Sequence, residues 1–360
     1  MQIQHDPRRA RLKLILTLLS LALSALAIWW ANNNLSSYYL RILNLAGINA
    51  ILAVSMNLIF GFTGLFSLGH AGFMAVGAYT CALLTLPMRS KQTIFLLAPL
   101  AWPFNAVTLP PFPAVLLAGL AAAVMAYLIG LPVLRLRGDY LGIATLGFAE
   151  IIRVVANNMP TITNGALGLK GIPSFANNLW WTWGWAAATV WVTSRLVNSV
   201  YGRSLLAVKE DEVAAEIMGV NLTYHKILSY VIGSAFAGVG GALMGSLVTA
   251  INPKTFGFML TFNILIIVVA GGLGSITGSV ITSVIYTVLL EALRPIESGW
   301  SIGPLHVPEI PGLRMVVFAL VLLVIILFYQ RGLFGGREFT WDGVLDWIDR
   351  KRNRKQEVAG

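Results

Sequence analysis

Apolar runs of 18 or more residues recur along the chain and are separated by short polar segments. Each run is long enough to cross a bilayer as an α-helix, which needs about 20 mostly apolar residues. The pattern therefore predicts an all-α polytopic membrane protein with about ten transmembrane helices. The predicted helices cover residues 12–30, 38–60, 67–86, 113–134, 139–156, 179–198, 227–250, 258–272, 275–293 and 313–330.

Two stretches depart from this simple pattern. Residues 94–103 are apolar but short and broken by proline, so we expect a re-entrant or interfacial segment there. Residues 8–27 have a basic start, an apolar run and Ala25-Leu26-Ala27, which resembles a signal-peptide cleavage site. The apolar run continues through Ile28-Trp29-Trp30, which favours a retained first helix over a cleaved signal peptide.

The end of the chain differs from the rest. We expect a transmembrane domain over residues 1–335, and residues 336–360 are too short and too charged to span a membrane. Apolar positions at i, i+3, i+4 and i+7 predict an amphipathic helix with a basic tail behind it; they are Trp341, Val344, Leu345 and Ile348. This helix either lies on the inner membrane surface or packs on loops of the same protein.

The composition agrees with a membrane protein. The chain of 360 residues is 57% hydrophobic and only 11% charged, whereas soluble domains carry about 25% charged residues. The basic residues behind its net charge of +10 lie between apolar spans, as in the loops of a membrane protein. This placement argues against a nucleic-acid-binding protein. The single cysteine, Cys81, allows no internal disulfide, and no residues have metal-ligand spacing. We therefore expect no cofactor bound by this chain and no catalytic set.

The basic residues predict the orientation. An even number of spans puts both termini on one side, and with the termini inside, seventeen Lys and Arg residues lie inside and eight outside. This excess favours cytoplasmic N- and C-termini. The outside set is Arg41, Arg89, Lys91, Arg153, Lys170, Lys254, Arg294 and Arg314.

A charged segment, residues 201–221, interrupts the apolar chain on the predicted cytoplasmic side. Residues 204–209 predict one short helix, and Asp211 is suited to cap a second helix that Gly219 ends. Glu212 lies in the first turn of the second helix, where the helix dipole favours an acid. Two short amphipathic helices need a partner, the membrane or the body of the protein to cover their apolar sides.

Few other polar positions fall inside the spans. Glu150 and Arg153 are three residues apart and share a helix face, so they form a structural ion pair or line an outer vestibule or partner contact. His70 is a structural hydrogen-bonding residue or lies on a transport path. The glycine-containing segments 64–69 and 272–277 each open an inside-to-outside span, and either serve close helix packing or are corresponding parts of two halves.

Several motifs resemble one family. Ala214-Ala215 followed by Gly219 resembles the cytoplasmic coupling motif of ABC importer permeases, although Val213 stands where that motif has Glu and Glu212 is one place early. Four stretches resemble the branched-chain amino-acid (LIV-type) ABC transporter permeases, in particular the longer of the two paired permease types; they lie at 56–79, 134–155, 201–221 and 268–280. The resemblance covers residues 35–335.

The resemblance implies an ABC importer permease fold and a multi-pass subunit of the bacterial inner membrane that imports branched-chain or other hydrophobic amino acids. The implied partners are a second permease subunit (a heterodimer), two cytoplasmic ATPase subunits that hold ATP-Mg, and a periplasmic substrate-binding protein. The chain itself has no phosphate-binding loop of the Gly-x-x-x-x-Gly-Lys-Ser/Thr type, so the ATPase is expected on another polypeptide.

The resemblance also implies roles for individual residues. Coupling to the ATPase is expected for Tyr201, Gly202, Arg203, Leu206, Lys209, Glu210, Asp211, Glu212, Ala214, Ala215, Ile217 and Gly219. The glycine clusters and the few polar residues in the spans, rather than the resemblance, give candidates for the translocation path or outer vestibule: Gly64, Ser67, Gly69, His70, Glu150, Arg153, Gly272 and Gly274.

Two alternatives stay open. The same machine is compatible with urea or short amides as cargo. A self-powered secondary transporter is the alternative from a different class, but such proteins usually carry several buried carboxylates or ion sites. Here only Glu150 and Glu291 lie inside or at the edge of a predicted span.

Overall fold

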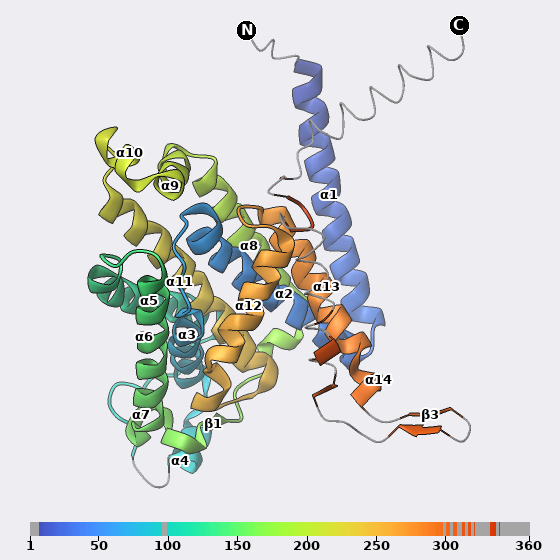
Figure 1. Cartoon of the computed structure of the whole chain (residues 1–360). Helices are drawn as coiled ribbons and strands as arrows, with labels where there is room; N and C mark the ends of the chain where they lie inside the picture. The colour runs from blue at the N-terminus through green and yellow to red at the C-terminus, as the bar shows by residue number, and fades with distance from the viewer. Residues whose placement is uncertain are drawn as a thin grey trace, which may run out of the picture.

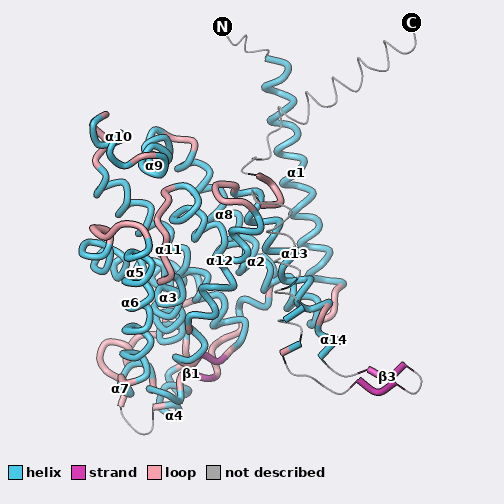
Figure 2. Tube along the Cα trace, viewed as in Figure 1, coloured by secondary structure: helices cyan, strands magenta, loops and turns pink. Residues whose placement is uncertain are grey.

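The protein is a bundle of helices (Figure 1). The computed structural model describes residues 7–95 and 99–297, together with 300–302, 305–307, 312, 313, 316, 317, 320, 332–335 and 338. Figure 2 shows that helices make up most of the described chain and that strands are few and short. The prediction of an all-α architecture therefore agrees with the described part.

The long helices follow the apolar runs. They are α1 (Pro7–Asn34), α2 (Ser37–Asn57), α3 (His70–Thr85), α5 (Pro111–Val133), α6 (Asp139–Asn157), α8 (Leu179–Val197), α11 (Leu222–Val248), α12 (Phe258–Gly271) and α13 (Ile276–Ala292). Each coincides with one of the first nine predicted ranges. The tenth range, 313–330, lies outside the described residues apart from a few scattered positions.

Short elements connect the long helices. They are η1, a π-helix (Leu58–Phe62), α4 (Met88–Ile94), α7 (Pro160–Thr163), η2 (Gly165–Leu167), η3 (Phe175–Asn177), α9 (Val200–Glu210), α10 (Glu212–Ile217), η4 (Pro253–Phe256) and α14 (Arg294–Glu297). Strands β1 (Leu169–Lys170) and β2 (Ala250–Ile251) pair antiparallel, as do β3 (Trp300–Ile302) and β4 (Leu305–Val307). The periodic pattern predicts none of these two- or three-residue strands.

Four described helical stretches are long and apolar enough to cross a membrane: 15–34, 37–62, 111–133 and 222–248. A fifth is added if α3 and α4, which meet at a bend of 118°, form one broken span. Of the predicted re-entrant segment, α4 ends at Ile94 and the described residues 99–103 are coil and turn. The C-terminal amphipathic helix predicted within 336–360 lies outside the described residues, except for Glu338.

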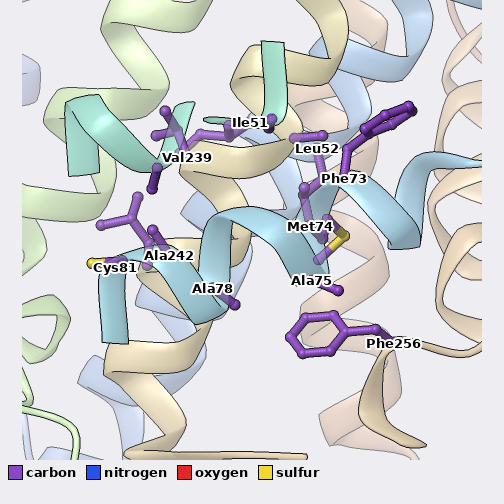
Figure 3. Packing of buried hydrophobic residues seen from close by; sticks show 14 of the residues in the cluster. Ile51, Leu52, Phe73, Met74, Ala75, Ala78, Cys81, Val239, Ala242 and Phe256 are labelled. Carbon is purple, nitrogen blue, oxygen red and sulfur yellow. The ribbon is translucent and has the colours of Figure 1, made fainter. Parts of the chain in front are cut away.

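The core forms around α3 and α11. Figure 3 shows Met74 and Ala78 of α3 and Val239 and Ala242 of α11 among the buried residues of this core, and all four are at most 4% exposed. Glycine makes this close approach possible, because a methyl group on Gly77 would overlap the backbone of Gly238. Gly241 approaches the backbone of Met74 in the same way, so the two helices touch backbone to backbone at two places, three residues apart on each helix.

The bundle has two ends of different character. Figure 1 shows α9, α10 and the N-terminal end of α1 together at one end, which we call the α9–α10 end. Helices α4 and α7 and strand β1 lie at the opposite end, which we call the α4–α7 end. The predicted charged segment thus lies away from the proline-rich connections.

Candidate functional site

The charged segment 201–221 forms two helices, as predicted. Asp211 caps α10, because its Oδ1 accepts hydrogen bonds from the backbone N–H groups of Val213 (2.8 Å) and Ala214 (3.0 Å). Gly219 ends it with φ 85°, a conformation that side chains resist. The N–H of Gly219 bonds to the carbonyl of Glu216, and that of Val220 to the carbonyl of Ala215, which is the Schellman arrangement.

Helix α9 is longer than the sequence predicts. It begins at Val200 rather than at residue 204, since Ser199 takes the N-cap position and faces the N–H of Gly202 at 3.5 Å. Gly202 is buried against the carbonyl oxygen of Val197, so a side chain there has no room. The turn between α8 and α9 is therefore tight.

The apolar base of α9 joins the segment to the bundle. Leu205 is fully buried and packs in a cluster with the end of α2, with η1 and with α13; its partners are Val54, Leu58, Phe62 and Ile276. Val208, three residues later, is also buried. Leu206, the apolar residue of α9 among the predicted coupling residues, is 38% exposed instead. The i, i+3 spacing of Leu205 and Val208 was the signal for the buried face.

An ion pair ties α10 to the bundle. Lys226 of α11 places its Nζ 2.5 Å from Glu212 Oε1, and the Lys226 side chain is only 6% exposed. Arg137, in the connection between α5 and α6, lies 3.5 Å from Glu212 Oε2. Glu212, the acid that stands one place early in the motif, thus faces the protein and not the solvent.

Most of the segment remains open to a partner. Ile217 is 80% exposed and Met218 is 82% exposed at the tip of α10. Of the twelve residues predicted for coupling, only Gly202 and Ala215 are buried and Glu212 is half-buried. The exposed ones are Tyr201, Arg203, Leu206, Lys209, Glu210, Asp211, Ala214, Ile217 and Gly219.

The two predicted glycine-containing turns lie side by side next to α9. A Cβ atom added to Gly61 would lie 2.6 Å from the backbone nitrogen of Gly274, so the turn after α2 touches the turn between α12 and α13. Gly64, Gly272 and Gly274 all have positive φ values, of 75°, 107° and 83°. The structure therefore brings Gly64 close to Gly272 and Gly274, which lie about 200 residues later in the sequence.

Asn57 holds these turns together. Its side chain is fully buried, and its Nδ2 donates to the Ser275 carbonyl and to Ser279 Oγ, both at 2.9 Å. Its Oδ1 accepts from the N–H of Gly274, also at 2.9 Å. The sequence analysis did not select Asn57, although an amide inside the apolar run 38–60 needs buried partners and was a usable signal.

Lys209 of α9 lies over both turns. A Cβ atom on Gly64 would lie 3.2 Å from its Cγ, and one on Gly274 would lie 3.9 Å from its Nζ. Together with Leu205, this contact makes α9 the neighbour of both turns. We refer to Asn57, Gly64, Leu205, Lys209 and Gly274 as the turn junction.

A further acid reaches the α12–α13 turn from the end of the chain. The Glu338 carboxylate accepts from the N–H groups of Ile276 (2.5 Å) and Thr277 (3.1 Å) and from Thr277 Oγ1 (2.7 Å). Residue 333 adds a backbone bond to the carbonyl of Ala270. The α13 N-terminus, where the helix dipole favours a negative charge, is thus occupied by a carboxylate. No sequence pattern predicted this contact.

The other predicted path residues lie deeper. His70 is buried and its Nε2 lies 2.9 Å from Ser55 Oγ, so it is held by a structural hydrogen bond. Ser67 is 7% exposed, and Gly69 approaches the carbonyl of Thr145 so closely that a Cβ atom would lie 3.0 Å from it. These residues join α3 to α2 and α6.

Glu150 and Arg153 form the ion pair that their spacing allows. Arg153 Nε and Nη2 both lie 2.7 Å from Glu150 Oε2, and the two side chains are 38% and 33% exposed for Glu150 and Arg153. The pair lies on α6, apart from the turn junction. The structure therefore divides the predicted path residues into a group at the turn junction and a separate pair on α6.

Comparisons with known proteins give one consistent match. Residues 38–327 match the family model described as "Branched-chain amino acid transport system / permease component". The chain is 32% identical over 277 residues to the high-affinity branched-chain amino acid transport system permease protein LivM of Salmonella typhimurium, which covers 68% of this chain and 61% of that protein.

Two further relatives extend the match. LivM of Escherichia coli is 32% identical over 306 residues, covering 76% of this chain and 67% of that protein. LivH of Salmonella typhimurium, a permease protein of the same named transport system, is 25% identical over 264 residues, covering 68% of this chain and 80% of that protein. The chain thus spans about 61% to 67% of the length of the two LivM relatives. No solved structure matches it.

Proposed function

This chain belongs to the family of permease components of branched-chain amino acid transport systems, and we propose that it moves branched-chain or other hydrophobic amino acids inward as one subunit of an ATP-driven importer. The higher identity to LivM than to LivH supports the longer permease type. The names of these relatives also support the cargo.

We assign the partners on the same basis. A second permease of the LivH kind completes a heterodimer, two ATPase subunits hold ATP-Mg, and a periplasmic binding protein delivers the cargo. The apolar runs of the sequence support ten spans in a bacterial inner membrane, and its charge distribution supports a cytoplasmic position for both termini and for the α9–α10 end. The ATPases then dock at the α9–α10 end.

The observation that carries this proposal is that one short segment combines an exposed tip with a buried base. Ile217 and Met218 offer apolar side chains to a partner, while Leu205 and Lys209 contact the turn junction. A displacement imposed on α10 passes through α9 to the turns after α2 and between α12 and α13. Alternating access then results from the movement of these turns.

Glu150 and Arg153 have a different role in this proposal. Charges in a membrane-embedded helix face a bundle interior, water or another protein, because lipid is costly for them. A pair that is about one third exposed in the isolated chain is therefore covered by the second permease or borders the aqueous path. Their neighbours on α6, such as Ile151, supply an apolar surface beside them.

The alternatives predict different energetics. The same machine with urea or short amides as cargo keeps the ATP dependence and changes only the competing solutes. A secondary transporter requires an ion gradient and no ATPase. The exposed tip of α10 favours the ATPase-driven machine, since a self-powered transporter has no need of a docking segment.

The decisive experiment is uptake into proteoliposomes that contain ATP and have no ion gradient. In the assembled transporter, Gly219→Val together with Ile217→Ala is expected to lower leucine uptake at least about tenfold, because the first change disturbs the end of α10 and the second removes an apolar contact of about 1–3 kcal/mol. Insertion and permease pairing are expected to stay normal.

Gly184→Ala is the matched control, since Gly184 has ordinary φ and no atom within 4 Å of an added Cβ. ATP-independent uptake by the unmodified transporter would refute the importer. Unchanged uptake by the double variant would refute the coupling role of α10.

A further inference from the structure

The α4–α7 end carries a surface with no acidic residue. Four segments make it: 88–95 with α4, the connection 99–110, the connection 158–178 and the turn 249–257. None of these segments contains Asp or Glu. Three of their basic residues, Arg89, Lys170 and Lys254, are exposed. We call this surface the basic platform.

Nothing in the described structure neutralises these three charges. The acids toward the same end whose side chains the structure describes are Glu150 and Glu291, and each pairs with the arginine three residues later in the chain, Arg153 and Arg294. None of the ion pairs among the described residues includes Arg89, Lys170 or Lys254. They form a positive field that attracts an acidic surface.

The platform is held by many hydrogen bonds. Lys91 is 3% exposed, and its Nζ donates to the carbonyls of Phe104 (2.8 Å) and Val107 (2.6 Å). The N–H of Ala101 donates to Thr161 in α7, and that of Leu109 to Leu84 at the end of α3. The pairing of β1 with β2 then joins Lys170 to Ala250. A connection fixed at so many points loses little entropy when a partner binds.

The platform also presents a large aromatic side chain. Trp102 is 82% exposed on the connection that Lys91 holds. Tryptophan is enriched among residues that dominate protein–protein binding. Figure 1 shows α4, α7 and β1 beyond the ends of the long helices. This position favours an aqueous partner over the lipid that surrounds the flanks of the bundle.

We propose that the basic platform is the docking surface for the cargo-binding protein, and that this protein meets it with an acidic surface around a pocket for Trp102. The proposal rests on the proposed function, which supplies a soluble partner on the side opposite the ATPases. Charge complementarity at such a rim mainly accelerates association and depends on salt. Arg89, Lys170 and Lys254 therefore set how much binding protein the transporter needs.

The test titrates the cargo-binding protein of the same transport system against the reconstituted transporter and measures initial leucine uptake. Arg89→Gln, Lys170→Gln and Lys254→Gln combined are expected to raise the half-saturating concentration of binding protein roughly tenfold and to weaken its dependence on NaCl. Maximal uptake at saturating binding protein is expected to stay unchanged, because none of the three residues touches the turn junction. Trp102→Ala is expected to raise the half-saturating concentration, and Trp102→Phe to raise it less.

Arg41→Gln is the matched control, since Arg41 is exposed at the start of α2 and outside the platform. An unchanged half-saturating concentration in the triple variant, or an equal change in the Arg41 variant, overturns the proposal. The same measurement is made in vesicles of phosphatidylcholine alone and in vesicles that also contain phosphatidylglycerol. If the effect of the triple substitution depends only on this lipid composition, the platform is a lipid contact and the proposal is overturned. If the unmodified transporter shows no ATP-driven uptake, the proposed function itself fails.

Discussion

The two ends of the bundle use charge differently. At the α9–α10 end Asp211 caps a helix and Glu212 pairs with Lys226 and Arg137, while Glu210 and Glu216 stay exposed on the same segment as apolar Ile217 and Met218. At the α4–α7 end exposed cations lie on segments without acids, and a buried lysine binds backbone carbonyls. The comparison indicates a contact of mixed apolar and charged character at the first end and a basic one at the second.

The two ends also differ in how they are tied to the helices. The α9–α10 end is joined to the bundle by side chains of the long helices α2 and α11 and of the short helix α9. The α4–α7 end is fixed by backbone hydrogen bonds among connections. We therefore expect substitutions at the first end to affect both stability and coupling, and substitutions at the second end to act locally.

The largest effect is expected for Asn57→Leu. The change removes three hydrogen bonds and leaves the buried N–H of Gly274 and the carbonyl of Ser275 without this partner, at a cost of about 3–5 kcal/mol. Thermal unfolding of the purified assembly, followed by scanning fluorimetry, measures it. Asn49→Leu on the same helix loses one bond, to Thr287, and is expected to cost about 1 kcal/mol. An equal loss of thermal stability in the two variants would show that the hydrogen bonds of the turn junction do not contribute more than an ordinary buried hydrogen bond.

An intermediate and asymmetric effect is expected at the ion pair of α10. Glu212→Gln leaves the almost buried Lys226 ammonium without its counter-charge, so the cost is about 3 kcal/mol. After Lys226→Met the Glu212 carboxylate keeps Arg137 as a counter-charge at 3.5 Å, so the cost is about 1 kcal/mol. Urea denaturation compares the two, and ATP hydrolysis per leucine transported is expected to rise in the first. If both variants lose the same stability, the pair does not anchor α10.

A smaller effect is expected for Lys91→Met at the opposite end. It leaves two carbonyls of the 99–110 connection without their donor, at a cost of about 2 kcal/mol, and loosens that connection. Limited proteolysis is expected to cut this connection faster, while ATP hydrolysis per leucine transported stays constant. The contacts suggest that the two ends act independently. A rise in ATP hydrolysis per leucine transported in the Lys91 variant would contradict this independence.

The sequence predicts the features that depend on near neighbours. The cap by Asp211, the stop at Gly219 and the pairing of Glu150 with Arg153 involve residues two to five positions apart, and local rules govern them. The nine described apolar ranges are also helical, because a membrane leaves few other backbone solutions. The start of α9 was missed because Ser199 lies outside the charged stretch.

Features that depend on distant neighbours could not be predicted. Asn57 and Gly274 are 217 positions apart, and nothing local to either indicates the other. Lys226 could equally have lain free at the membrane surface, and only the path of α11 brings it to Glu212. The basic platform is similar, because its four segments become one surface only when β1 pairs with β2 and residue 101 meets residue 161.

The backbone contact between Gly77 and Gly238 reduces the number of helices that can move independently of one another. With no side chains between them, α3 and α11 have no layer that can shear, so they rotate and translate as one unit. One end of α11 continues directly from α10, and the N-terminus of α3 continues directly from the turn that holds Gly64. The tip of α10 and this turn are therefore connected twice, once through α9 and once through the fused helices, which gives a closed loop with few internal degrees of freedom.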